Sequence, residues 1–265
     1  MDFIKKEERL HSRDSRPKNV GSNLEQLLEF GAVADELPTP TPPKHQRRVH
    51  HIRVERSARY ETLGPENGSA RELWFLLHGY GQLAASFIRL FASIDDGTRL
   101  LVAPEALNRF YLVGVETAPA SDRPVGATWM TKEDRLNEMR DYVAYLDAVA
   151  ARVAATVDQE AAIVVLGFSQ GAATASRWVA SGGIRPERLV LWGGHLPPDI
   201  DTSAQLRSTS LELVIGTRDR FISDERLADE ERRMQTKGLP YTVTRYEGGH
   251  GIVEATLRKV AERRA

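Results

Sequence analysis

The stretch Ala161-Ala162-Ile163-Val164-Val165-Leu166-Gly167-Phe168-Ser169-Gln170-Gly171-Ala172-Ala173-Thr174 decides the fold. Six apolar residues lead directly into a Gly-x-Ser-x-Gly motif, and small residues at helical spacing follow it. This order predicts a buried strand, a sharp turn and a helix, with Ser169 at the apex of the turn. A serine in that position stands above the carboxyl edge of a sheet, so we predict that Ser169 is a nucleophile.

The segments on both sides of this stretch alternate between strand and helix patterns. Short apolar runs predict buried parallel strands, whereas the apolar positions from Leu136 to Val157 step by three and four and predict a long helix. We therefore predict an α/β fold with one mostly parallel central sheet and helices on both of its faces. The strands are expected at residues 73–77, 100–104, 163–166, 189–192, 211–215 and 241–246.

Three segments lie outside this pattern. Residues 1–45 are rich in charge and then in proline, and we predict an N-terminal extension with one short helix ahead of a catalytic domain at residues 46–265. Alternating apolar residues at Val49, Ile52 and Val54 predict an early strand or hairpin. The stretch from Glu105 to Thr131 is expected to be irregular and is long enough to act as a partial lid.

Composition narrows the classes of function. The formal net charge is −1, which gives no support for binding to nucleic acid or to an anionic membrane surface. Cysteine is absent, which excludes disulfides, thiolate metal sites and a cysteine nucleophile. The N-terminus lacks the apolar core of a secretion signal, and the apolar runs are too short to span a membrane, so the expected location is the cytoplasm. The sequence leaves the pairing of subunits open, with a homodimer as one outcome.

A serine nucleophile needs a base and a group that orients the base. In the predicted fold the order along the chain is serine, acid, histidine, and these residues lie on loops after strands. His250 follows the last strand and is the predicted base, with His195 as the rival. Asp219 follows the strand at 211–215 and is the predicted acid, whereas Asp224 is the competitor and is expected to cap a helix.

Hydrolysis of an ester also needs two hydrogen-bond donors for the oxyanion. We predict that the backbone N–H of Gln170 is one of them, because it begins the helix after the serine. The second donor is expected in the loop after the strand at 73–77, at the N–H of Tyr80, with Gly81 as the fallback. His78 in the same loop is expected to brace it rather than to act as a base.

Four motifs together resemble the phospholipase/carboxylesterase family of α/β-hydrolases, which includes the acyl-protein thioesterases. They are Leu77-His78-Gly79-Tyr80-Gly81, Gly167-Phe168-Ser169-Gln170-Gly171-Ala172, Gly216-Thr217-Arg218-Asp219 and Gly249-His250. The resemblance covers residues 70–262 and also includes Trp129-Met130, which is similar to an aromatic pair near the site in that family. Thioesterase members continue the His-Gly pair with Leu-Gly-Asp, whereas this chain has Tyr80-Gly81-Gln82, which favours a carboxylesterase acting on small esters.

The expected activity is therefore the hydrolysis of a small carboxylic ester through Ser169, His250 and Asp219. Trp129, Phe221 and Ile222 are candidates for an apolar wall of the substrate site, with ordinary packing as the equal alternative. No metal-ligand cluster, phosphate-binding glycine loop or dinucleotide motif is present, so no cofactor is expected. An acyl-thioesterase or a lysophospholipase is the alternative enzyme, and a non-catalytic ligand receptor is the alternative of a different class.

Overall fold

The computed structural model describes residues 46–114, 119–200 and 204–263, and a seven-stranded sheet lies at its centre. The strand order is β1-β3-β2-β6-β7-β8-β9, in which β1 runs antiparallel to β3 and every other neighbouring pair is parallel. The strands are β1 (Tyr60–Leu63), β2 (Glu72–Leu77), β3 (Arg99–Pro104), β6 (Ala162–Phe168), β7 (Arg188–Trp192), β8 (Ser210–Gly216) and β9 (Tyr241–Tyr246).

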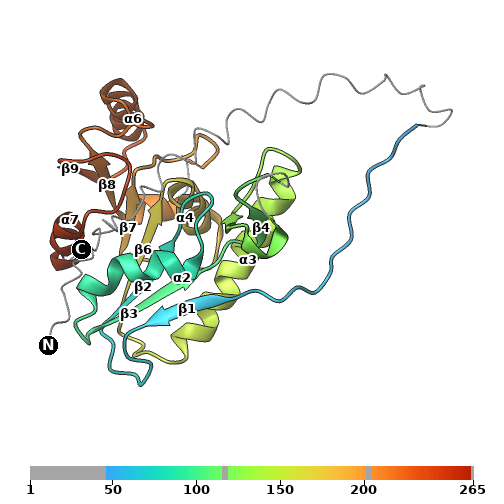
Figure 1. Ribbon diagram of the computed structural model, residues 1–265. Helices are drawn as coiled ribbons and strands as arrows, with labels where there is room; N and C mark the ends of the chain where they lie inside the picture. The colour runs from blue at the N-terminus through green and yellow to red at the C-terminus, as the bar shows by residue number, and fades with distance from the viewer. Residues whose placement is uncertain (1–45, 115–118, 201–203, 264–265) are drawn as a thin grey trace, which may run out of the picture. The chain divides into compact units, whose positions relative to one another are not determined.

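Helices cover both faces of this sheet (Figure 1). They are α2 (Ala84–Phe87), the 3-10 helix η3 (Ile88–Ile94), α3 (Arg135–Ala154), α4 (Gln170–Ser181), α5 (Ala204–Ser208), α6 (Asp224–Thr236) and α7 (Glu254–Glu262). One apolar core lies between the sheet and helices α3, α4 and α6. A second apolar core lies between the other face of the sheet and α2, η3 and α7. Strand β2 contributes side chains to both cores, because Phe75 faces the first core and Trp74 faces the second.

The predicted α/β-hydrolase architecture is confirmed by this arrangement. All six strands that the apolar runs predict are present, and the long helix predicted from Leu136 is α3. Because the parallel strands all end at the same edge, the loops after β2, β6, β7, β8 and β9 meet there. The predicted site residues on these loops therefore lie at the carboxyl edge of the sheet.

Two local predictions were wrong. Residues 46–59 contain no strand, and Val49, Ile52 and Val54 are 67%, 87% and 77% exposed, so their alternation has no partner to pack against. The stretch from Glu105 to Thr131 is not wholly irregular, since β4 (Asn108–Tyr111) and β5 (Val125–Thr128) pair as a small antiparallel sheet. The helix predicted within residues 1–45 lies outside the described residues. Arg53–Ala265 forms a compact unit, to which the sheet and its helices belong.

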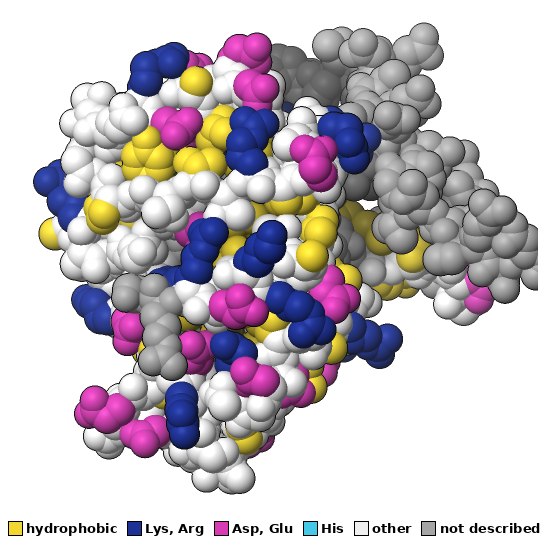
Figure 2. All heavy atoms as spheres, turned by 90° about the vertical axis from the view of Figure 1, so that its left-hand side faces the viewer, with side chains coloured by type: hydrophobic (Ala, Val, Ile, Leu, Met, Phe, Trp, Pro, Cys, Tyr) yellow, Lys and Arg dark blue, Asp and Glu magenta, His cyan; other side chains and the backbone are white. Residues whose placement is uncertain are grey.

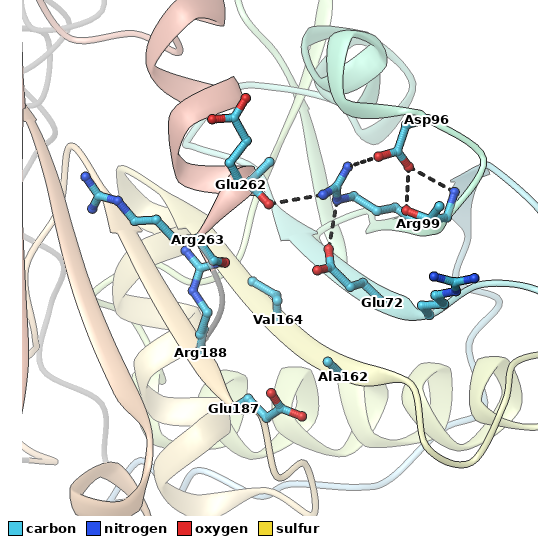
Figure 3. A pocket seen from close by; sticks show the side chains of 12 residues that line it. Glu72, Asp96, Arg99, Ala162, Val164, Glu187, Arg188, Glu262 and Arg263 are labelled. Carbon is cyan, nitrogen blue, oxygen red and sulfur yellow. Dashed lines mark hydrogen bonds and ion pairs between the residues drawn. The ribbon is translucent and has the colours of Figure 1, made fainter.

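A pocket of about 630 Å³ lies at the opposite, amino edge of the sheet, where β2, β6 and β7 begin (Figure 3). Arg99 donates hydrogen bonds to Glu72 over 2.7 Å and to Asp96 over 2.5 Å. Arg188 pairs with Glu212 over 3.0 Å, and the two side chains are 6% and 5% exposed. Carboxylates of the lining compensate Arg99, and Glu212, behind the lining, compensates Arg188. These ion pairs are structural contacts.

The face shown in Figure 2 carries basic and acidic side chains in alternation, with small apolar areas between them. This mixture agrees with the formal net charge of −1 and is typical of a solvated surface. Among the described residues, none of the helices combines the length and the apolar character that crossing a membrane requires.

Candidate active site

Ser169 occupies a strained turn between β6 and α4. Its backbone angles are φ 54° and ψ −116°, a conformation that non-glycine residues rarely adopt. The turn also requires the flanking glycines, because a β-carbon at Gly167 would lie 2.3 Å from the carbonyl oxygen of Gly171. A β-carbon at Gly171 would in turn lie 2.1 Å from the carbonyl oxygen of Leu77. The sequence thus folds locally into the sharp strand–turn–helix that the motif predicts.

Asp219 and His250 meet at this edge from the loops after β8 and β9. Nδ1 of His250 lies 2.8 Å from Oδ2 of Asp219, and the Asp219 side chain is fully buried. The other carboxylate oxygen accepts hydrogen bonds from the backbone N–H groups of Phe221, over 2.8 Å, and Ile222, over 3.2 Å. Both oxygens of the carboxylate are therefore engaged, and the group is fixed in orientation.

These contacts set the charge of the carboxyl group. Burial alone would raise the pKa of Asp219, but hydrogen bonds from His250 and from the N–H groups of Phe221 and Ile222 outweigh burial and lower it. Asp219 is thus an ionised acceptor at neutral pH, so Nδ1 of His250 carries the proton. Nε2 is then the nitrogen that can accept a proton from a hydroxyl.

Aromatic rings hold the imidazole of His250 beside the serine turn. The ring of Phe168, the residue before Ser169, lies 4.8 Å from the imidazole centroid, and Phe221 packs edge-on at 4.6 Å. Gly193, after β7, passes so close that a β-carbon there would lie 2.9 Å from Cε1 of His250. Serine turn, imidazole and carboxylate therefore form one packed group at the carboxyl edge.

The rival residues lie elsewhere. His195 is exposed on the loop after β7, and Asp224 forms an ion pair with Arg245 over 2.7 Å in the first turn of α6. Ser223 caps that helix by accepting a hydrogen bond from the N–H of Arg226. The structure brings His250 together with Asp219 and not with Asp224.

The loop after β2 presents the backbone N–H of Tyr80 as a donor. The N–H of Gly79 donates to the side chain of Gln82 over 2.8 Å, and the N–H of Gly81 donates to Ala127 over 2.9 Å. Among the described residues, the N–H of Tyr80 has no acceptor within the protein. Because Gly81 is already engaged, the geometry favours Tyr80 over the fallback as an oxyanion donor. Gln170, the first residue of α4, has an N–H with no acceptor inside its helix.

His78 braces this loop, as the sequence suggested. It is completely buried, its Nδ1 lies 2.8 Å from the carbonyl oxygen of Gly79, and its Nε2 accepts from the N–H of Ala106 over 3.0 Å. Burial lowers the pKa of His78 to about 4, against weaker opposing effects from Gly79 and Glu105. A neutral imidazole with both nitrogens engaged has no capacity left to act as a base.

Two supporting side chains were missed by sequence reasoning. Gln82 holds the loop after β2 through its bond to Gly79. The side-chain amide of Gln170 accepts from the N–H of Trp129 over 3.1 Å and donates to the carbonyl oxygen of Met130 over 2.9 Å. The contact of Gln82 lies within one loop, whereas the two contacts of Gln170 join segments 41 and 40 residues apart in the chain. Nothing in local patterning indicates either set of contacts.

The three candidates for the substrate wall differ in position. Trp129 is 1% exposed and its indole N–H donates to the carbonyl oxygen of His78 over 2.8 Å, so it supports the loop from behind and offers no surface to a substrate. Phe221 is 38% exposed beside His250 and can form a wall. Ile222 is 9% exposed and lines a pocket next to the Asp219 loop.

The match to a protein family decides the class. A family model described as serine hydrolase (FSH1) matches residues 74–255, which is more than half of the chain. The chain belongs to the FSH1 serine hydrolase family. It is therefore an enzyme, and the predicted resemblance to α/β-hydrolase esterases is confirmed at this level. The matched residues include every strand of the main sheet except β1 and the first residues of β2.

Solved structures agree with the fold of this FSH1 serine hydrolase. Esterase PE8 is 22% identical, with 77% of this chain and 96% of that chain covered and a TM-score of 0.58. Acyl-protein thioesterase 2 of Zea mays is 18% identical over 78% of this chain and 97% of its own, with a TM-score of 0.59. A carboxylesterase from Mesorhizobium loti is 20% identical over 77% and 93%, also with a TM-score of 0.59. No curated protein matches the sequence.

A metal centre has no counterpart in this arrangement. Within residues 46–114, 119–200 and 204–263, histidine, aspartate and glutamate side chains nowhere form a cluster of three that could hold a metal ion. The polar groups at the carboxyl edge include a hydroxyl, an imidazole, a carboxylate and backbone N–H groups. These are the groups that acyl transfer uses.

Proposed function

We propose that the chain is a serine esterase that hydrolyses small carboxylic esters through an acyl-enzyme. In this proposal Ser169 is the nucleophile, His250 the general base and acid, and Asp219 the group that orients His250. The observation that carries the proposal is the 2.8 Å contact between His250 and a fully buried Asp219, packed against the strained turn that presents Ser169.

Acylation begins when Oγ of Ser169 attacks the ester carbonyl carbon and its proton passes to Nε2 of His250. The carbonyl oxygen becomes an oxyanion, which the N–H groups of Tyr80 and Gln170 stabilise by hydrogen bonds. Asp219 stabilises the imidazolium that forms. Collapse of the intermediate breaks the bond to the alcohol oxygen, which takes the proton from His250 and leaves.

Deacylation repeats the sequence with water. His250 removes a proton from water, the hydroxide oxygen attacks the acyl carbon, and the oxyanion again faces Tyr80 and Gln170. When the intermediate collapses, Oγ of Ser169 leaves and recovers its proton from His250, and the carboxylic acid is released. The loss of one oxyanion donor typically raises the activation free energy by about 3–4 kcal/mol in such sites.

The test is the Ser169→Ala variant with p-nitrophenyl acetate as substrate. Removal of the hydroxyl eliminates the nucleophile, so we expect turnover to fall to the level of buffer while circular dichroism and the thermal midpoint stay near those of the wild type. Turnover that persists in this variant contradicts the assignment of Ser169.

The class of substrate is tested by comparing an oxygen ester with a thioester and with a lysophospholipid. The name of one structural relative, an acyl-protein thioesterase, keeps a thioester as the second candidate. We expect p-nitrophenyl acetate to be a better substrate than S-acetyl thiocholine or a lysophospholipid, because the chain carries Tyr80-Gly81-Gln82 in place of the thioesterase pattern. A higher kcat/KM for either alternative substrate reverses this preference.

A further inference from the structure

A pocket of about 430 Å³ lies next to the Asp219 loop, between the carboxyl half of β8, helix α6 and the loop after β7. Its lining includes the aliphatic side chains of Leu213, Ile215, Ile222 and Leu227, all of which belong to the buried core. The exposed side chains of His195, Arg226 and Asp229 and the ion pair between Glu230 and Arg233 make up its polar rim. An apolar floor with a polar rim, in a volume at the lower end of small-molecule sites, suits a short aliphatic group.

The wall of this pocket is held in place by a buried carboxylate. Glu230, whose side chain is 8% exposed, accepts a hydrogen bond from the N–H of Leu196 over 2.9 Å. Arg233 pairs with Glu230 over 2.7 Å and donates to the carbonyl oxygen of Leu196. Side chains of α6 therefore bind both the N–H and the carbonyl oxygen of Leu196. These contacts fix the position of the loop after β7 relative to α6 and maintain the pocket between them.

Residues that line the pocket lie next to the segments that carry the proposed catalytic group. A β-carbon on Gly194 would lie 3.0 Å from the carbonyl oxygen of Ser169, so this lining residue passes directly beside the serine. The N–H of Ile222 donates to Asp219, and Arg226 donates to the carbonyl oxygen of Phe221 over 2.9 Å. The pocket therefore adjoins the segments that carry Ser169 and Asp219.

The strand order indicates which part of the ester faces the pocket. The loop with Tyr80 follows β2, on one side of β6, whereas the pocket lies beside β7 and β8, on the other side. Asp219 and His250 follow β8 and β9, also on the pocket side. Around a tetrahedral carbon on Ser169 the oxyanion points toward Tyr80, and the leaving oxygen points toward the imidazole that protonates it.

We infer that this pocket binds the alcohol part of the substrate and that it selects esters of uncharged, short aliphatic alcohols. The inference rests on the proposed function of Ser169, His250 and Asp219. It makes the residues of α6 determinants of specificity, although they touch none of the reacting atoms.

The experiment compares two series of esters with the full-length wild type and with pocket variants. One series varies the alcohol (ethyl, butyl and octyl acetate), and the other varies the acid (ethyl acetate, butyrate and octanoate), with released acid followed by titration. Leu227→Phe adds volume at the floor, and His195→Trp narrows the rim. Leu136→Phe is the control, since Leu136 is 59% exposed on α3, away from the pocket.

In the wild type we expect kcat/KM to rise from ethyl to butyl acetate. In both pocket variants the ratio of kcat/KM for butyl acetate to that for ethyl acetate is expected to fall roughly tenfold, as a change of about one methylene does in an apolar site. The ratio of ethyl butyrate to ethyl acetate is expected to stay the same, and the Leu136→Phe control is expected to leave both ratios unchanged.

A change in the acid series without one in the alcohol series overturns the inference, as does the absence of a change in both. Failure of the proposed function has a different signature, since wild type and Ser169→Ala would then hydrolyse ethyl acetate equally. Thermal midpoints of the variants are measured in parallel. If one pocket variant fails to fold, the other variant is evaluated with the same two ratios of kcat/KM, butyl to ethyl acetate and ethyl butyrate to ethyl acetate.

Discussion

At the scale of single residues, two histidines in similar glycine-rich surroundings are held in opposite ways. His78 is completely buried and bonded through both ring nitrogens to backbone groups, whereas His250 pairs one nitrogen with Asp219. The sequence predicted this difference from the order of the residues along the chain. Order alone, however, reveals nothing about which backbone groups His78 would contact.

The lowered pKa of His78 predicts a dependence of stability on pH. The pKa is about 4 in the folded protein and near 6.5 when unfolded, so between these values the unfolded chain binds the extra proton. Stability is therefore lost as pH falls from 6.5 to 4. We expect the free energy of unfolding to decrease by about 3 kcal/mol over this window from His78 alone.

The measurement is urea unfolding of the wild type and of His78→Gln across this window. The amide of glutamine can still accept from the N–H of Ala106 but does not titrate, so the variant is expected to lack the decrease that His78 causes. Parallel pH profiles for the two proteins would contradict the assignment of a neutral, structural His78.

Asp219 offers a second prediction at this scale. Asparagine in its place keeps the size of the side chain but favours the wrong tautomer of His250, and in a triad this lowers kcat by roughly ten-thousandfold. Asp224→Asn, at the first residue of α6, is the matched control, because Asp224 is 77% exposed and pairs with Arg245. We expect the control to retain wild-type kcat; a loss of less than tenfold in Asp219→Asn would contradict the role of Asp219.

At the scale of elements, the strands and the serine turn were predictable because burial imposes continuous apolar runs. The pair β4–β5 was missed because its exposed residues do not carry such a pattern: Tyr111 is 49% exposed and Val125 36%. The strand expected around Val49 failed for the converse reason, since alternation alone does not supply a partner. Long-range pairing decides both cases.

The contact between Gln170 of α4 and the residues after β5 predicts an effect on stability when it is removed. Gln170→Met leaves the N–H of Trp129 and the carbonyl oxygen of Met130 without their partner. We expect a loss of about 1–3 kcal/mol in the free energy of unfolding, the usual cost of orphaned polar groups. Gln235→Met on exposed α6 surface is the control, with an expected change within about 0.5 kcal/mol. Equal effects of the two substitutions in urea unfolding would contradict the bridging role.

At the scale of the whole molecule, the parallel sheet is what unites the site. Ser169, Asp219 and His250 are far apart in the chain, yet they follow β6, β8 and β9, which end at one edge. This convergence could be predicted from strand order in the fold class. The supporting contacts of Gln170 and the burial of Trp129 depend on how loops from different strands pack, which local sequence patterns do not encode.

The boundary between an N-terminal extension at residues 1–45 and a catalytic domain at residues 46–265 is a proposal at this scale. Arg53–Ala265 forms a compact unit, and Arg59 already pairs with Glu105 over 2.8 Å within it. We expect a protein that begins at Arg53 to keep the thermal midpoint and the kcat/KM of the full chain on p-nitrophenyl acetate. A start after Arg59 is the comparison, since it removes the ion pair and is expected to lower the midpoint. A loss of activity on removal of residues 1–52 would show that residues ahead of the compact unit contribute to catalysis.

The most direct test of the central claim is the crystal structure of the protein after reaction with a small alkyl fluorophosphonate. The account predicts phosphorus bonded to Oγ of Ser169, with the phosphoryl oxygen within about 3 Å of the backbone nitrogens of Tyr80 and Gln170 and the imidazole of His250 beside the adduct. Phosphorus on another residue, or a phosphoryl oxygen turned away from both N–H groups, would contradict it.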